Sequence, residues 1–213
     1  MKNRMILFLG APGAGKGTQA ALVVDALGIE TLSTGNILRK EVDQGSKLGN
    51  KAKFYMDKGD LVPDEVVNGI VADSLKKFQG KGLILDGFPR NLEQAKFLDD
   101  QRVEFDLVVY FDLSLHEVQQ RMGGRRICKK CGDTYNIFSK KPIFDGICDS
   151  CGDRLIIRRD DKPEVVKDRY ENFLGKTQPL LDFYEKNSVV VKLDANSNIE
   201  KIKDDVIAEI VRN

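Results

Sequence analysis

A glycine-rich segment near the amino terminus constrains this chain more than any other feature of its sequence. Residues 10–18 read Gly-Ala-Pro-Gly-Ala-Gly-Lys-Gly-Thr, directly after an apolar run at 5–9 and before apolar residues at helical spacing. Glycines let successive backbone N–H groups point inward at one anion, and the positive end of the following helix adds to the attraction. The segment therefore predicts a phosphate-binding loop between a strand and a helix.

The residues of this loop have separable roles. Lys16 supplies a mobile charge for the outer phosphates, and Thr18 supplies a hydroxyl for magnesium. Serine or threonine usually follows the lysine directly, so the intervening glycine indicates a subgroup of such loops. The alternative to a phosphate-binding loop is a glycine-rich turn that binds no ligand. The backbone groups expected to cradle phosphates belong to Gly13, Ala14, Gly15 and Gly17.

The rest of the chain alternates between apolar runs and helical patterns. Continuous apolar runs suit strands that are covered on both faces, and they occur at 4–9, 29–32, 82–85, 107–111 and 189–193. Helix starts are indicated at 63–65, at 161–164 with a long helix through Leu174, and at Ser197, which would form a capping box with Glu200. The alternation predicts an α/β fold, a parallel sheet with helices on both sides and ligands at the carboxyl ends of the strands.

Composition narrows the possible partners. The 213 residues carry 34 lysines and arginines against 33 aspartates and glutamates, so no strong overall field attracts nucleic acid or anionic lipid. No apolar run reaches the roughly 18 residues that a membrane span requires, and the run at 5–9 is too short for a signal peptide. We expect no membrane partner.

The four cysteines form two matched pairs. Cys128 and Cys131, then sixteen residues, then Cys148 and Cys151 have the spacing of a zinc ribbon, in which four thiolates hold a structural zinc ion. Two disulfides or a redox pair are the competing interpretations, and a ribbon alone would also be compatible with nucleic-acid binding. Paired rather than scattered cysteines favour the cytoplasm.

Several motifs in this order resemble those of the adenylate kinases. They are the Gly-Lys-Gly-Thr loop, Ser33-Thr34-Gly35 with Arg39, Asp86-Gly-Phe-Pro-Arg90 followed by Gln94, Gly-Arg-Arg at 124–126 and Arg-Asp-Asp at 159–161. The resemblance covers nearly the whole chain. It implies a P-loop nucleoside-phosphate kinase fold in one unit, 1–213, which acts as a monomer. The implied parts are a core at 1–32, 63–124 and 159–213, a helical NMP-binding flap at 33–62 and an inserted zinc-ribbon-like lid at 125–158.

The resemblance also implies the reaction, a reversible magnesium-dependent transfer from ATP to AMP that gives two ADP by direct in-line displacement. Gln94 suits adenine because a carboxamide can both donate to a ring nitrogen and accept from an amino group. Phe88-Pro89 is expected as a cis peptide. The AMP site implied by the family would comprise Thr34, Arg39, Asp60, Leu61, Val62, Gly87, Phe88, Pro89, Arg90, Gln94, Arg158 and Arg169.

On the ATP side the resemblance adds Arg121, Arg125, Thr134 and Tyr135 to the loop, with Tyr135 beside the adenine. Arg121 and Arg125 would share a helix face if the helix from Leu115 continues that far. Asp86 would join Thr18 in holding magnesium through water. Phosphoryl transfer needs cations where charge accumulates, and the implied catalytic set is Lys16, Arg90, Arg121, Arg125, Arg158 and Arg169.

Alternatives remain at two levels. Thr34 could cap a helix beginning near Ile37, Asp86 could cap another, and Gln94 alone could face solvent. For the whole protein, a UMP/CMP kinase would use the same scaffold, although Gln94 favours AMP. A zinc-ribbon nucleic-acid-binding module is the alternative from another class, and the near-zero net charge disfavours it.

Overall fold

A parallel five-stranded sheet forms the centre of the computed structural model, which describes residues 4–78, 80, 82–186 and 188–213. Residues 1–3, 79, 81 and 187 of the expected core lie outside the described residues. The strand order is β2-β3-β1-β4-β8. All five apolar runs of the sequence are confirmed as strands, namely β1 (Met5–Gly10), β2 (Glu30–Ser33), β3 (Leu83–Asp86), β4 (Leu107–Asp112) and β8 (Val189–Asp194).

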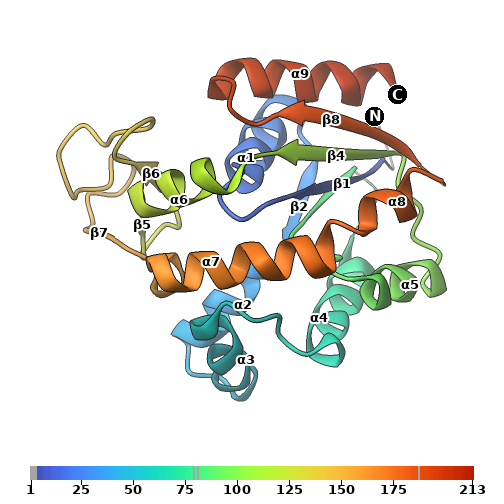
Figure 1. Ribbon diagram of the computed structural model, residues 1–213, viewed down its shortest axis with the longest axis horizontal. Coiled ribbons are helices and arrows are strands. Elements are labelled where there is room, and N and C mark those ends of the chain that lie inside the picture. The colour runs from blue at the N-terminus through green and yellow to red at the C-terminus, as the bar shows by residue number, and fades with distance from the viewer. Residues whose placement is uncertain (1–3, 79, 81, 187) are drawn as a thin grey trace.

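The apolar runs are continuous because the central strands are covered on both faces. Leu7, Leu85 and Val108 are fully buried. Helices lie on both sides of the sheet (Figure 1), and α1 (Lys16–Leu27) packs with α9 (Ile199–Arg212). The remaining core helices are α4 (Asp64–Lys77), α5 (Leu92–Asp100), α6 (Leu115–Gly124), α7 (Pro163–Asn172) and α8 (Leu180–Tyr184), with a short 3-10 turn η1 (Arg159–Asp161) and a π-helical segment η2 (Phe173–Thr177).

The register of the sheet brings several chemically active residues to one edge. Asp86, the last residue of β3, pairs with Phe8 of β1 on one side and with Ser33, the last residue of β2, on the other. The phosphate-loop segment leaves β1 two residues beyond Phe8. Parallel strands all end at the same edge, so the loop, Ser33 and Asp86 are neighbours although they lie far apart in sequence.

Two insertions extend from this edge. One is helical and contains α2 (Thr34–Asp43) and α3 (Lys47–Lys58), which pack against each other. The other is a small antiparallel sheet of order β6-β5-β7, made of β5 (Arg125–Cys128), β6 (Thr134–Asn136) and β7 (Leu155–Ile156). In Figure 1 these insertions lie on the same side of the molecule, next to the amino-terminal end of α7.

Three details of the helices differ from the sequence prediction. The α9 cap is Asn198 and not Ser197, because the Asn198 side chain accepts from the Lys201 N–H at 2.7 Å at the point where the chain turns into the helix. The long helix predicted through Leu174 is α-helical only to Asn172 and continues as the π segment.

The third difference concerns α6. This helix ends at Gly124, because Arg125 takes an extended conformation and starts β5 while the Gly124 carbonyl accepts from the Ile137 N–H. Arg121 and Arg125 therefore do not share a helix face.

No helix in the described part of the chain combines the length and hydrophobicity that a bilayer crossing would require.

Candidate active site

The glycine-rich segment forms a closed loop over the end of β1. Lys16 Nζ donates to the carbonyl oxygens of Gly10 at 2.7 Å and Ala11 at 2.9 Å, so its charge lies across the loop. Gly13 has a φ of +79°, and a Cβ atom there would lie 2.9 Å from Met122 Cγ on α6. Only glycine fits this position, which explains why the sequence has it there.

Lys16 interacts electrostatically with the carboxylate of Asp86 at the end of β3. Burial lowers the pKa of Lys16 to about 8, with Arg90, Arg169 and Arg125 acting in the same direction and Asp86 opposing them. Asp86 is 9% exposed and accepts from Ser33 Oγ at 3.3 Å. A Cβ on Gly17 would lie 3.5 Å from Asp86 Oδ2, so the loop backbone passes close to this carboxylate. A buried cation with an incomplete set of negative partners is suited to an arriving phosphate.

A single large cavity joins these groups. It has a volume of about 1090 Å³, and we call it the main cavity. Sites for one small ligand typically measure about 300 to 1,000 Å³, so this space exceeds what one ligand needs. Every residue that the sequence assigned to ATP lines it, namely Gly13, Ala14, Gly15, Lys16, Gly17, Thr18, Arg121, Arg125, Thr134 and Tyr135.

Magnesium fits the same part of the cavity. Asp86 and Thr18 both line the main cavity, and carboxylate and hydroxyl oxygens are ligands that suit this ion. The idea that Asp86 caps a helix is wrong for α5, because the Asn91 side chain caps that helix by accepting from the Gln94 N–H. The Asp86 carboxylate is therefore available to a metal ion and to Lys16.

The second group of expected residues gathers around the Gly87 carbonyl. This oxygen accepts from Thr34 Oγ1 at 2.8 Å and from Arg90 Nε at 2.7 Å. The alternative that Thr34 caps a helix near Ile37 is wrong, because α2 begins at Thr34 itself and the hydroxyl is directed to Gly87. The bond ties the first turn of α2 to the end of β3.

A smaller side cavity opens next to the main one. Gln94 is 2% exposed and lines this cavity, so the solvent-facing alternative is wrong. Phe88 is fully buried and packs edge to face on Phe97, which leaves only its backbone for a ligand. Its bond to Pro89 is cis, as expected. The expected AMP residues that line the side cavity are Thr34, Arg39, Asp60, Leu61, Val62, Gly87, Arg90, Gln94 and Arg169, while Pro89 and Arg158 line the main cavity.

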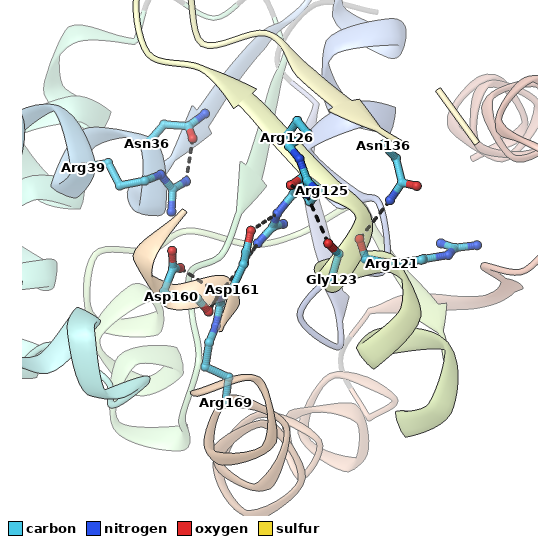
Figure 2. Close-up of polar contacts among 10 residues, drawn as sticks. All are labelled: Asn36, Arg39, Arg121, Gly123, Arg125, Arg126, Asn136, Asp160, Asp161 and Arg169. Atoms are coloured by element: carbon cyan, nitrogen blue, oxygen red, sulfur yellow. Dashed lines mark hydrogen bonds and ion pairs between the residues drawn. The ribbon is translucent and has the colours of Figure 1, made fainter. Parts of the chain in front are cut away.

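Arginines from separate elements converge around Asp160 and Asp161 (Figure 2), and two of them, Arg39 and Arg169, line both cavities. Arg125 Nε, from the start of β5, donates to Asp161 Oδ2 at 2.7 Å, and its second nitrogen donates to the other oxygen of that carboxylate. Arg169 on α7 donates to Asp160 Oδ2 at 2.7 Å and to Asp161 Oδ1 at 3.4 Å. Arg39 on α2 points toward the same space and donates to Asn36 Oδ1 at 2.6 Å.

The two aspartates do not neutralise this cluster. Burial opposes the charge of Arg125, but the hydrogen bonds that Arg125 donates to the Asp161 carboxylate raise the pKa of Arg125 above its ordinary value. Arg158 lacks such support, and burial together with the charges of Arg125 and Arg39 lowers its pKa to about 9. Its Nε atom is buried and has no hydrogen-bond partner in the described part of the chain. An anion placed here would pair with charges that are already desolvated and fixed.

Sequence reasoning missed the role of these carboxylates. The sequence motif that contains Asp160 and Asp161 predicts no contact for either residue. The Arg125–Asp161 pair spans 36 residues, so no local pattern could reveal it. The loop after β8 was also missed, although the rule that ligands lie at the carboxyl ends of strands would have found it. Residues 196–200 line the main cavity there.

Arg121 lies apart from the other arginines. Its guanidinium donates to the Ala195 carbonyl in the loop after β8, and Figure 2 shows it on the side of α6 away from Asp161. Asn136 Nδ2 donates to the Arg121 carbonyl at 2.8 Å and so joins β6 to the end of α6. Arg121 therefore faces the end of the main cavity near α9.

Tyr135 does not present its ring to a nucleotide. The side chain is 3% exposed and lies in the small core of the β5–β7 unit, with its hydroxyl 3.6 Å from Cys148 Sγ. The ring fills the space next to the cysteines, so little of its surface is exposed to an adenine in the main cavity, which Tyr135 also lines.

The four cysteines meet at one point beside this ring. Their sulfur atoms all lie within 4.8 Å of one another, with 3.4 Å between Cys128 and Cys151 and 3.5 Å between Cys131 and Cys148. Tetrahedral zinc with bonds near 2.3 Å requires sulfur separations of about 3.8 Å, so the set fits this ion. The two Cys-x-x-Cys segments form the same kind of turn, since the N–H groups of Gly132 and Gly152 donate to the backbone carbonyls of Cys128 and Cys148 at 2.9 Å. All four are free thiols, so the two-disulfide alternative is not supported.

A glycine-rich loop at the end of β1, a buried lysine and several arginines around a cavity larger than one ligand needs define a P-loop nucleotide phosphotransferase. The family model for "Adenylate kinase" matches residues 8–189. The chain belongs to the adenylate kinase family and is a nucleoside monophosphate kinase.

Similar proteins cover nearly the whole chain. The adenylate kinase of Archaeoglobus fulgidus is 46% identical over 92% of this chain and 93% of its own length. That of Petrotoga mobilis is 44% identical with the same coverage, and that of Thermodesulfovibrio yellowstonii is 43% identical over 95% and 97%. These matches favour neither a UMP/CMP kinase nor a nucleic-acid-binding module.

Proposed function

We propose that the main cavity, extended by the side cavity of about 50 Å³ that adjoins it, holds ATP and AMP end to end, so that a phosphoryl group passes directly between them in either direction and no covalent enzyme intermediate forms. The observation that carries this proposal is the concentration of desolvated positive charge in one cleft. Six cationic side chains face three carboxylates, namely Lys16, Arg39, Arg90, Arg125, Arg158 and Arg169 against Asp86, Asp160 and Asp161. An in-line transfer needs alignment and charge stabilisation more than any nucleophile of the protein.

On the donor side, loop N–H groups and Lys16 bind the ATP phosphates, and Arg121 and Arg125 approach them from the end of α6 and the start of β5. Lys16 is free to move from the loop carbonyls onto the transferred group, because its side chain is tethered only by hydrogen bonds. Thr18 and Asp86 hold magnesium through water. When bound, this ion neutralises charge on the donor phosphates.

On the acceptor side, Arg39 and Arg90 hold the AMP phosphate near the Gly87 carbonyl, and Gln94 contacts the base. Arg158 and Arg169 lie between the two sites and stabilise the charge of the group in transit. Removal of an arginine with this role costs on the order of 10³-fold in rate in related enzymes. The side cavity is adjacent to the main one, which supports an end-to-end arrangement of the two nucleotides.

Closure of the two insertions keeps water from competing with AMP. We assign residues 33–62 as the NMP-binding flap and 125–158 as the lid, with Arg125 and Arg158 at the two ends of the lid. Lys129 of the lid lies 3.5 Å from Asp43 of the flap, which supports direct contact between them during closure. This pair is exposed and is worth only about 0 to 1 kcal/mol, so nucleotides rather than the pair would hold the lid shut.

A structural zinc ion bound by the four cysteines would order the lid. The unit has a small apolar core of its own, in which the buried Tyr135 and the partly buried Leu155 pack beside the cysteines. Zinc binding energies of roughly 10 to 16 kcal/mol in small zinc-folded peptides are large enough to compensate for such a small core. Four sulfur ligands leave no open position for water, so the ion takes no part in catalysis.

The cellular setting belongs to the same proposal. We infer a cytoplasmic monomer that uses ATP and AMP and has neither a nucleic-acid nor a membrane partner. Four free cysteine thiols support the cytoplasmic location, and a net charge near zero supports the absence of a nucleic-acid or membrane partner. The monomeric state is proposed from the family resemblance. Light scattering after gel filtration measures the oligomeric state.

The acceptor assignment is tested by a coupled assay with AMP, CMP, UMP and GMP at saturating Mg-ATP. We expect the highest kcat/KM with AMP. A higher value with CMP or UMP would overturn the choice of acceptor, whereas the absence of transfer to all four would overturn the proposed function itself.

A further inference from the structure

The carboxamide of Gln94 is held by two neighbours of opposite character. Its Oε1 accepts from the backbone N–H of Arg90 at 2.7 Å, and its Nε2 donates to Asp64 Oδ1 at 2.7 Å. Asp64 is the first residue of α4, while Gln94 lies in the first turn of α5, 30 residues further along the chain. Two helix starts therefore meet at this one amide.

Asp64 is itself fixed in place. Asn91 Nδ2 donates to both oxygens of the Asp64 carboxylate, at 3.0 and 3.2 Å. The Asn91 Oδ1 atom accepts from the Gln94 N–H at 2.8 Å, so the orientation of the Asn91 amide is also determined. The result is a closed circuit in which the backbone of Gln94 orients Asn91, Asn91 holds Asp64, and Asp64 holds the Gln94 side chain.

These partners allow the Gln94 amide only one orientation. A carboxylate can only accept hydrogen bonds and a backbone N–H can only donate one. If the amide were turned over, its oxygen would face the Asp64 carboxylate and its NH₂ group would face the Arg90 N–H. Both contacts would then be repulsive, and buried polar groups would lose their partners.

The fixed amide still has hydrogen-bonding capacity for a ligand. Among the described residues its contacts use one N–H and one lone pair, which leaves one N–H and one lone pair for the side cavity that Gln94 lines. A base with a ring-nitrogen acceptor beside an amino group, as in adenine or cytosine, complements this arrangement. A base with a ring N–H beside a carbonyl, as in hypoxanthine or uracil, would require the amide to turn over.

We propose that Asp64 is a specificity-determining positioning residue, which locks the Gln94 carboxamide so that the acceptor site selects 6-amino over 6-oxo purines. This inference rests on the proposed role of Gln94 at the acceptor base. Asp64 itself contacts no nucleotide and acts only through Gln94. Rejection of an analogue that leaves a site's polar groups mismatched is far stronger than rejection based on size.

The test compares AMP with IMP as acceptors at saturating Mg-ATP, in the full-length protein and three variants. Asp64→Asn removes the strict acceptor, since an asparagine can either donate to Gln94 or accept from it. Gln94→Ala removes the amide. Glu65→Gln is the matched control, because it makes the same change on the next residue of α4, which is exposed. In each protein, kcat and KM are measured for both acceptors and KM for ATP.

We expect Asp64→Asn to reduce the ratio of kcat/KM for AMP to that for IMP by tenfold or more, corresponding to the loss of one charge-assisted hydrogen bond that disfavours the turned amide. The change should be a rise in KM for AMP and a gain with IMP, with KM for ATP unchanged. Glu65→Gln should behave as the wild type. A merely structural role of Asp64 would lower activity with both acceptors alike.

The remaining outcomes distinguish failures of this proposal from failures of its basis. If Gln94→Ala lowers the ratio and Asp64→Asn does not, the lock is wrong while the role of Gln94 stands. If neither variant changes the ratio, Gln94 does not contact the base and both are wrong. If Asp64→Asn does not fold, the wild-type protein is assayed instead with CMP and UMP as acceptors. The proposal then requires a higher kcat/KM with CMP than with UMP, and equal values overturn it.

Discussion

Replacing Asp161 with asparagine should both destabilise the protein and slow the reaction. The Asp161 side chain is completely buried, accepts from Arg125 Nε at 2.7 Å and lies 3.4 Å from an Arg169 nitrogen. Arg125 and Arg169 are each only 16% exposed, so both charges stay buried when the carboxylate is lost. An asparagine keeps the shape but cannot accept both nitrogens of Arg125, since one of its own positions is a donor.

The magnitude follows from the burial of the pair. Removing one member of a buried ion pair costs about 3 to 5 kcal/mol, because the remaining charge is desolvated without compensation. In a chain of this size 1 kcal/mol shifts Tm by roughly 2 to 4 °C, so we expect Tm to fall by about 6 to 20 °C. Arg125 would also lose its fixed position at the start of the lid, and a displacement of a catalytic group by about 1 Å can reduce kcat by up to roughly 100-fold.

The assay combines thermal unfolding by circular dichroism with steady-state kinetics at a temperature where the variant is folded. Asp168→Asn provides the matched control, because this residue is an exposed aspartate of the same helix as Arg169, and its replacement should change stability by less than about 0.5 kcal/mol. If Asp161→Asn melts within about 2 °C of the wild type and retains its kcat, the argument that this carboxylate holds the arginine cluster is refuted.

Three further predictions follow from other parts of the site. Lys16→Ala should reduce kcat by at least 100-fold, in the range seen when one preorganised electrostatic contact is removed. Its Tm should not fall, since burial of the Lys16 charge is itself unfavourable. A kcat within tenfold of the wild-type value would contradict the role of Lys16. Chelation of the lid metal, with its loss verified by atomic absorption, should lower Tm and expose residues 125–158 to protease, and unchanged melting of the metal-free protein would refute a structural ion. The charges of Arg169 and Arg39 hold the pKa of Asp160 below its ordinary value despite burial. Ionised Asp160 therefore stabilises the folded protein above a pH of about 4, and this contribution is lost as the pH falls through its folded-state pKa. In Asp160→Asn the free energy of unfolding, measured by urea melts, should fall less steeply between pH 5 and pH 2, and an unchanged pH dependence would contradict the pairing.

The sheet could be predicted because its signal is local. Strands such as β1 and β4 are apolar along nearly their whole length, since both faces are covered, and the turn from β1 into the glycine-rich loop follows directly in sequence. Positions at strand ends, such as Asp86, were then predictable from topology alone. The same reasoning located the lysine and the loop correctly in the main cavity.

Other features were out of reach because they depend on contacts between distant segments. The end of α6 at Gly124 depends on pairing with Ile137 in the lid, so sequence spacing alone could not decide whether the helix continues to Arg125. Asp161 faces Arg125 across 36 residues, and Asp64 faces Gln94 across 30. The choice between Ser197 and Asn198 as the cap of α9 was ambiguous locally, since both residue types cap helices well.

The central claim is that one cleft binds two nucleotides end to end. It is tested most directly by calorimetric titration with a compound that joins adenosine at both ends of a polyphosphate chain, followed by competition with ATP alone and AMP alone. The account predicts one molecule bound per chain, with affinity well above that of either nucleotide and competition by both. Competition by ATP but not by AMP, or binding of the linked compound no tighter than ATP, would contradict it.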